Sequence, residues 1–263
     1  MKNFYPFMKY LKSFAIVIFL AVPALADDSL SVFHKDDVIV FQGDSITEGG
    51  RQREGNDYNH TMGQDYAYII AAQLGALYPE RNLTFINRGI SGNRVNDLAG
   101  RWQRDTLDLK PNFLSILVGV NDTLIHDSKT ETVGQYERVY EQLITNTLAA
   151  LPHVKIVLCE PFLLSVANPH GWPDFKDKKI YDAQMIEIKK HQEVVAKLAE
   201  KYHLPEVHFQ KAFDDACQKA PAEHWCWDGV HPTYAGHGLM VQEWLKTVNA
   251  FWSDASKPLP GKS

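Results

Sequence analysis

Short runs of apolar, often β-branched residues alternate along this chain with longer stretches in which apolar residues recur at helical spacing. The first pattern is typical of buried strands and the second of amphipathic helices. A strand followed by a helix, about five times in succession, predicts an α/β fold with parallel strands and helices on both faces of the sheet. We expect strands at residues 37–41, 83–87, 113–118, 154–159 and 206–209, and helices at residues 66–77, 95–109, 131–151, 178–202 and 234–248.

The mature chain is expected to form one domain. No linker or change in composition divides residues 30–250, and we place the domain at residues 27–256. Its longest irregular connection, residues 162–177, contains the polar and aromatic sequence NPHGWP and is a candidate substrate-facing loop. Residues 257–263 are predicted to be a disordered tail.

The N-terminus has the character of a targeting segment. Met1–Lys12 carries three lysines and no acidic residue, an apolar run follows, and Ala24-Leu25-Ala26 ends the segment. These features predict a secretory signal peptide that is cleaved after Ala26. The alternative is a membrane anchor, but the apolar run has about ten residues where a span needs about twenty. We therefore expect export without a membrane span after cleavage, to either the periplasm or the medium.

Composition and charge exclude some classes of partner. The chain has 263 residues, of which 45% are hydrophobic and 22% charged, and its net charge is −5. Removing the signal peptide with its three lysines lowers this charge to −8 (−5 − 3). Because phosphate binding needs clustered cations and no stripe of lysine and arginine is present, nucleic acid is not an expected partner. The oligomeric state has no sequence signal.

The three cysteines have different surroundings. Cys159 ends an apolar run and is expected to be a free, packed thiol. Cys217 and Cys226 lie nine residues apart, and in an oxidising compartment they either close a disulfide or stay free.

Candidate chemistry gathers where the predicted strands end. Glycine and polar residues follow four of the strands, as Gly43-Asp44-Ser45, Gly89–Asn93, Gly119–Asp122 and Glu160-Pro161. In open α/β sheets, sites form beyond the carboxyl ends of the strands, so these residues are expected to share one edge.

Ser45 and His231 are candidates for a nucleophile and its base. A serine hydroxyl is a poor nucleophile until a base takes its proton. In Asp228-Gly229-Val230-His231-Pro232, the carboxylate can hold the imidazole through Nδ1–H and leave Nε2 free to accept that proton. Considered singly, Ser45 could equally be a helix N-cap and Asp228 a turn residue that caps the last helix.

Acyl transfer also needs donors for an oxyanion. Gly92 lies in a loop where a backbone N–H can approach a ligand closely, and Asn121 offers a carboxamide after the third strand. With the backbone N–H of Ser45 they would make three donors. A turn or cap is the alternative role for both residues.

Taken together, the blocks resemble the SGNH (GDSL-type) hydrolase family. They read Gly43-Asp44-Ser45-Ile46, with isoleucine where the family name has leucine, then 87–93, 119–122 and 228–232, in family order. The resemblance implies that Ser45 is the nucleophile, His231 the general base and acid, and Asp228 its orienting partner. It also implies that Gly92 and Asn121 join Ser45 as oxyanion donors, and that the fold is a flavodoxin-like, three-layer α/β/α sandwich around a five-stranded parallel sheet.

Motifs of other enzyme classes are absent from the sequence. It contains no Gly-x-Ser-x-Gly elbow, His-Glu-x-x-His, P-loop or Gly-x-Gly-x-x-Gly. We therefore expect no metal and no cofactor.

The expected substrate is a small-molecule or polysaccharide ester. Export, polar loops and aromatic residues favour an O-acetyl group on carbohydrate. The alternatives are a lipolytic esterase or lysophospholipase with the same triad and, from another class, a catalytically silent carbohydrate-binding domain. Core packing or a solvated surface is the alternative role for each residue that we single out for substrate contact, namely Arg94, Trp172, Trp225 and Trp227, with Arg51, Arg53, Arg88 and His170 as further candidates.

Overall fold

The computed structural model describes residue 30 and residues 32–55, 57–123, 132–169 and 173–253. The predicted signal peptide, the predicted tail, His170 and Trp172 lie outside the described residues.

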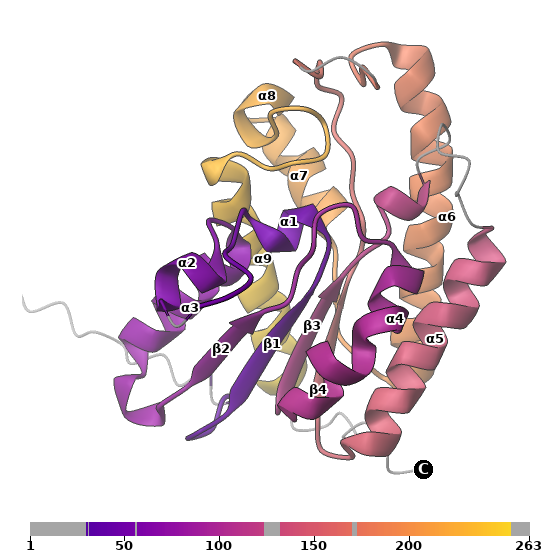
Figure 1. Ribbon diagram of the computed structural model, residues 1–263. Coiled ribbons are helices and arrows are strands. Elements are labelled where there is room, and N and C mark those ends of the chain that lie inside the picture. Colours follow the sequence, from indigo (N-terminus) through magenta and orange to yellow (C-terminus); the bar gives the residue numbers. More distant parts are fainter. Residues whose placement is uncertain (1–29, 31, 56, 124–131, 170–172, 254–263) are drawn as a thin grey trace, which may run out of the picture.

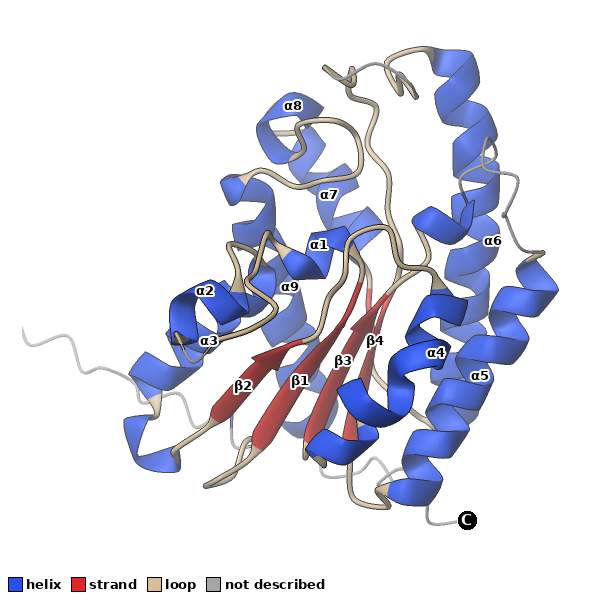
Figure 2. Cartoon of the chain, viewed as in Figure 1, coloured by secondary structure: helices blue, strands red, loops and turns tan. Residues whose placement is uncertain are grey.

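The centre of the molecule is a five-stranded parallel sheet in the order β2-β1-β3-β4-β5 (Figure 2). This is the strand order of flavodoxin-like folds. It confirms the predicted fold class, and the bounds of every strand lie within two residues of those expected. The strands are β1 (Val38–Gly43), β2 (Thr84–Asn87), β3 (Phe113–Leu117), β4 (Lys155–Cys159) and β5 (Glu206–Val207).

Helices cover both faces of the sheet, with α3, α7 and α9 on one side and α4, α5 and α6 on the other (Figure 1). Successive side chains of a strand point to opposite faces. In β1, therefore, Ile39 and Phe41 pack under Trp244 and its neighbours, whereas Val40 joins the cluster around Trp102. The helices are α1 (Ser45–Glu48), α2 (Tyr58–Met62), α3 (Tyr66–Leu77), α4 (Val95–Asp105), α5 (Val133–Ala150), α6 (Lys178–Tyr202), α7 (Phe209–Cys217), α8 (Ala222–Trp225) and α9 (Tyr234–Ser253).

The structure departs from the predicted elements in several places, and α9 ends at Ser253, five residues beyond its predicted end at 248. Phe209 begins α7 instead of ending the fifth strand, and the helix predicted at 95–109 ends at Asp105, followed by a separate 3-10 turn at Leu107–Leu109. The short helices α1, α2 and α8 were not expected, because one turn of helix is too short to show apolar periodicity.

The long connection between β4 and α6 is partly buried. Phe162, Leu163, Leu164 and Phe175 are at most 3% exposed and pack into the core. Other described residues of the connection are exposed, among them Ala167, Pro169 and Asp174, and residues 170–172 lie outside the described residues, so the substrate-facing role of the polar stretch stays a prediction.

All three cysteines are free thiols, so the disulfide alternative for Cys217 and Cys226 is not formed. Cys159 is fully buried, as predicted, and burial raises the pKa of its thiol to about 12. Among the described residues, no helix combines the length and the apolar character that crossing a membrane requires.

Candidate active site

The predicted site residues converge at the carboxyl edge of the sheet. Ser45 is the first residue of α1, directly after β1, and Asn121 begins a 3-10 turn after β3. Asp228 and His231 lie on the loop between α8 and α9, which passes over α1 (Figure 1). The chain therefore folds two segments 186 positions apart onto each other.

Ser45, His231 and Asp228 form a hydrogen-bonded chain. The Oγ of Ser45 lies 2.8 Å from Nε2 of His231, and Nδ1 of the same ring lies 2.6 Å from Oδ2 of Asp228. These are normal lengths for strong hydrogen bonds. With the proton on Nδ1, the ring donates to Asp228 and accepts from the serine hydroxyl.

A tight turn presents Ser45. The Oδ1 of Asp44 accepts from the backbone N–H of Ile46 at 3.0 Å and caps α1. A Cβ at position 43 would stand 2.4 Å from the carbonyl oxygen of Leu117 and 2.3 Å from Oγ1 of Thr47. Only glycine fits there, so Gly43 lets α1 start directly against β3.

A second turn holds the carboxylate of Asp228. Its Oδ1 accepts from the backbone N–H groups of Val230 and His231 at 2.9 and 2.7 Å, which leaves Oδ2 for the imidazole. A further hydrogen bond anchors the backbone of this turn, because Leu164 N–H donates to the carbonyl of Gly229 at 2.9 Å. The buried connection after β4 therefore supports the loop that carries Asp228 and His231.

The interactions at the site lower the pKa of Asp228 and raise the pKa of His231. Burial alone would raise the pKa of Asp228, but the bonds from the ring and backbone of His231 outweigh it and lower that pKa. Burial likewise opposes protonation of His231, yet the bond to Asp228 raises the pKa of the imidazole above its ordinary value. The neighbouring Asp44 is fully buried, and this burial raises its pKa to about 7.

Gly92 and Asn121 belong to two loops that the structure joins. Nδ2 of Asn121 donates to the carbonyl of Asn93 at 3.1 Å, and Oδ1 of Asp122 accepts from Val95 N–H at 3.0 Å. Gly92 has φ of +77°, a left-handed conformation that strains other residues. It is also exposed, so its backbone is open to a ligand.

Arg101 is a positioning residue that sequence reasoning missed. Its guanidinium, on α4, donates to the carbonyls of Arg88 and Gly43 at 2.8 and 3.2 Å and to Oδ1 of Asn93 at 2.8 Å. It thus ties the ends of β1 and β2 to the loop that contains Gly92. An arginine in a helical pattern resembles a surface cation, and nothing local reveals these contacts.

The residues predicted to contact substrate have different surroundings in the structure. Trp227 is 42% exposed, and its ring stacks on that of His231 with centroids 5.3 Å apart and planes at 18°. Trp225 packs against the core, which favours the packing alternative. Arg94 is half-buried at the N-cap of α4.

Three further arginines lie away from the triad. Arg51, Arg53 and Arg88 line a cavity beside α2 and β2 whose lining includes neither Ser45 nor His231. Arg51 is buried and donates to the carbonyl of Gly89 at 3.0 Å, while Arg53 pairs with Glu48 at 2.9 Å. Both contacts favour structural roles.

Known proteins resemble this chain in sequence and fold. The model of the GDSL-like lipase/acylhydrolase family matches residues 41–239. An acetylxylan esterase from Geobacillus stearothermophilus is 31% identical over 222 residues, which are 81% of this chain and 94% of that protein. The crystal structure of such an esterase, Axe2 from the same organism, has a TM-score of 0.70 at 30% identity and covers 82% of this chain and 95% of its own. A GDSL-like protein from Parabacteroides merdae has a TM-score of 0.71 at 38% identity, over 83% of this chain and 98% of its own.

The matched region contains all four sequence blocks, strands β2 to β5 and the second half of β1. This confirms the resemblance noted in the sequence. The chain belongs to the GDSL-like lipase/acylhydrolase family and is a serine carboxylic ester hydrolase of the SGNH type.

Proposed function

We propose that this protein removes O-acetyl groups from carbohydrate through an acyl-enzyme formed on Ser45. The observation that carries the proposal is the hydrogen-bonded chain from Ser45 Oγ through His231 to Asp228, with contacts of 2.8 and 2.6 Å. The same three residue types, in the same relation, activate serine nucleophiles on unrelated folds.

The proposed reaction has two halves. In the first, Oγ of Ser45 attacks the ester carbonyl carbon while Nε2 of His231 takes the hydroxyl proton, and the imidazolium then gives this proton to the departing sugar oxygen. In the second, water attacks the acetyl-serine, His231 takes a proton from the water and returns it to Ser45, and acetate leaves. Asp228 stabilises the imidazolium that each half forms.

The tetrahedral intermediate carries a negative oxygen in both halves. The proposed donors to it are the backbone N–H groups of Ser45 and Gly92 and the carboxamide of Asn121. The bond from Asn121 to the carbonyl of Asn93 supports this assignment, because it holds the carboxamide against the loop that contains Gly92. Donors that are positioned in advance cost no reorganisation when the charge develops.

Two observations favour an acetylated sugar. The relative that shares 31% identity is an acetylxylan esterase, and solved structures of that esterase include catalytic mutants in which a serine or an aspartate is replaced by alanine. In this chain, the exposed ring of Trp227 lies beside His231 and offers a flat surface on which a sugar ring can stack.

The test measures acetate release from acetylated xylooligosaccharides beside p-nitrophenyl esters of acetyl, butyryl, octanoyl and dodecanoyl groups. We expect kcat/KM to be highest for acetyl and to fall by about tenfold or more by octanoyl, since each additional methylene needs apolar surface to cover it. A rise with chain length would instead establish the lipolytic alternative.

Ser45→Ala is the control for mechanism. We expect kcat on every ester to fall by about 10⁵-fold to 10⁶-fold, as loss of the nucleophile does in serine hydrolases. If Ser45→Ala hydrolyses p-nitrophenyl acetate like the parent, Ser45 is not the nucleophile. Binding of acetylated oligosaccharide by a parent that hydrolyses no ester would support the catalytically silent alternative. Export stays a prediction, and fractionation of the native host tests it.

A further inference from the structure

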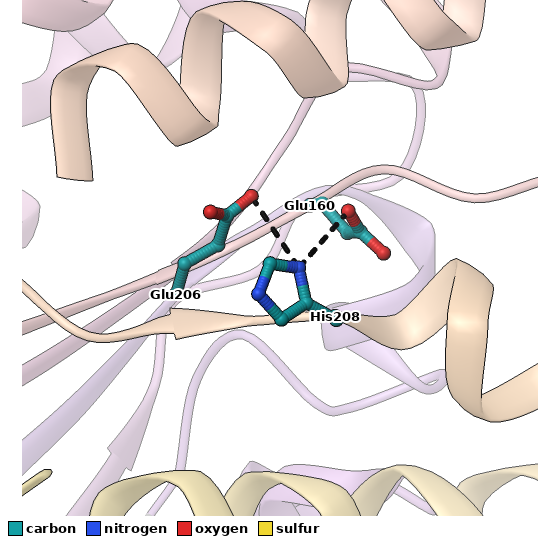
Figure 3. A group of neighbouring side chains, drawn as sticks. All are labelled: Glu160, Glu206 and His208. Atoms are coloured by element: carbon teal, nitrogen blue, oxygen red, sulfur yellow. Dashed lines mark ion pairs between the residues drawn. The ribbon is translucent and has the colours of Figure 1, made fainter. Parts of the chain in front are cut away.

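A second group of titratable side chains, which shares no residue with the triad, lies beside β4 and β5 (Figure 3). Glu160 follows β4, Glu206 is the first residue of β5, and His208 follows β5. One donor atom from each residue lies within 4.8 Å of the other two. As Figure 3 shows, both carboxylates face the imidazole of His208.

The distances in this group do not fit a hydrogen-bonded ion pair. Nδ1 of His208 lies 3.6 Å from Oε2 of Glu160 and 3.7 Å from Oε1 of Glu206, beyond hydrogen-bond length in both cases. Where this protein pairs a histidine with one carboxylate through a hydrogen bond, as His60 with Asp57, the contact closes to 2.6 Å. Nδ1 of His208 stands almost equally far from both carboxylates and closes onto neither.

The same separations suit an ion bound between the three side chains. Zinc bonds of about 2.1 Å in tetrahedral geometry place the ligand atoms about 3.4 Å from one another. Two of the three separations are already 3.6 and 3.7 Å, and the third is at most 4.8 Å. A carboxylate movement of about 1 Å would complete the geometry.

Glu160 supplies independent support. Its side chain is only 9% exposed, so it is more than nine-tenths buried. Oε1 accepts from the backbone N–H of Gln210 at 2.8 Å, which fixes the carboxylate. Oε2 faces His208, whose Nδ1 lies 3.6 Å away. A buried carboxylate is costly unless a cation or a hydrogen bond compensates its charge.

The opposite side of the group is open to solvent. The side chain of His208 is 53% exposed, and Glu206 and His208 line a cavity of about 310 Å³ with Lys246 and Thr247. Lys246 is paired with Glu243 at 3.0 Å, which offsets its charge. The cavity offers an entry path and room for water as a further ligand.

We propose that Glu160, Glu206 and His208 bind one divalent transition-metal ion of the zinc type through two carboxylate oxygens, Nδ1 of the imidazole and water. An imidazole with two carboxylates is a nitrogen and oxygen donor set that suits zinc better than the oxygen-only sites of calcium and magnesium. This site goes beyond the proposed esterase function, because none of its ligands belongs to the triad.

The position of the site assigns it a structural role. The ion would join the end of β4 to β5 and to the start of α7. A chain of hydrogen bonds links this group to the active site. Leu163 N–H donates to the side chain of Gln210 at 2.9 Å, and the next residue, Leu164, donates to the turn that carries Asp228. Metal binding should therefore stabilise the fold around that turn.

The first experiment titrates ZnCl₂ into chelator-stripped protein by calorimetry and follows the melting temperature Tm. We expect one binding site and a rise in Tm of about 5 °C when the free ion is about 100-fold above its Kd. MgCl₂ and CaCl₂ at the same concentration should raise Tm far less. Absence of Zn²⁺ binding at a large molar excess would overturn the proposal.

The second experiment locates the site. His208→Ala, at an accessible position, and Glu206→Gln, which keeps the shape of a side chain only 12% exposed, should each weaken Zn²⁺ binding by about tenfold to 100-fold. The matched control is His34→Ala, because His34 lies 3.7 Å from a single carboxylate, Asp37, without a second one opposite. Binding that persists unchanged in His208→Ala would place the ion elsewhere. Ser45→Ala should bind Zn²⁺ like the parent, so a failure of the esterase proposal is distinguishable from a failure of this one.

Discussion

Two histidines at the same edge of one sheet face carboxylates in different ways. His231 closes onto Asp228 at 2.6 Å, whereas His208 stands 3.6 and 3.7 Å from Glu160 and Glu206. The first pair shares a proton along a fixed hydrogen bond. The second group leaves a space between its donor atoms that an ion can occupy.

The difference follows from how the backbone supplies each carboxylate. Asp228 and His231 lie on one turn, whose N–H groups bind the same carboxylate and bring it to the ring. Glu160 and His208 come from the ends of neighbouring strands, which lie about 4.8 Å apart. These two side chains do not share a turn and stand beyond hydrogen-bond length, so similar residues acquire different chemistry.

The substitution with the largest expected effect on kcat breaks the hydrogen bond between His231 and Asp228. Asp228→Asn should lower kcat on acetyl esters by about 10⁴-fold, because the amide favours the wrong tautomer of His231. The matched control is Asp57→Asn, which disrupts an equally short contact to His60 at the surface and should leave kcat near the parent value. Zn²⁺ affinity should stay unchanged in Asp228→Asn; a parallel loss of both properties would mean that the two groups are one site.

Removing an oxyanion donor should have the next largest effect. We expect Asn121→Ala to lower kcat by about 10²-fold to 10³-fold with a smaller change in KM, because the carboxamide acts mainly in the transition state. Asn121→Asp has the same shape without the N–H donors and should lose at least as much. Steady-state kinetics with Tm as the folding control measures both variants, and a loss within about twofold would remove Asn121 from the proposed hole.

The pH profile reports the charge state of His231. Neutral imidazole is the base, so kcat/KM should fall about tenfold for each pH unit below its pKa. Because Asp228 raises the pKa of His231, the midpoint should lie above about 6.5, so activity is retained above this midpoint and lost as the pH falls through it. A flat profile from about pH 4 to about pH 9 would contradict the assignment of His231 as base.

The smallest expected effect concerns the ring that stacks on His231. Trp227→Ala should raise KM for acetylated xylooligosaccharides by about twofold to tenfold, the range that a lost aromatic stacking contact covers. KM for p-nitrophenyl acetate should change less, because this substrate has no sugar. The control is Trp225→Phe, since Trp225 packs against the core. Equal effects of Trp227→Ala on both substrates would show that the ring acts on His231 and not on the sugar.

The predictable part of the fold rests on long patterns. The apolar runs that became β1 to β4 and the helical periods of α3, α5 and α6 appear at nearly their predicted bounds, because burial of a whole strand or helix face leaves a repeated signal. The strand predicted at 206–209 shortened, since α7 begins at Phe209. Only two residues of β5 pair with β4, and the apolar pattern of the sequence does not predict where this pairing ends.

The candidate triad could be located from sequence because each member follows a recognisable block at a strand end or turn. Arg101 could not be located in this way. Its positioning role depends on hydrogen bonds to carbonyl oxygens at the end of β1 and in the connection after β2, which only the fold brings to it. The connection after β4 was predicted to face substrate from its polar and aromatic composition. Its apolar residues Phe162 and Leu164 are buried and support the turn that carries Asp228, while the substrate-facing role of the polar stretch stays a prediction.

The order of residues alone therefore determined the α/β class and the family and named the candidate reactive side chains, since these depend on local spacing and on short blocks. Only the folded chain decided which carboxylates close onto an imidazole and which stay apart. That outcome depends on a separation of a few ångströms between segments distant in the chain, and it is set by the spacing of strands and the anchoring of turns.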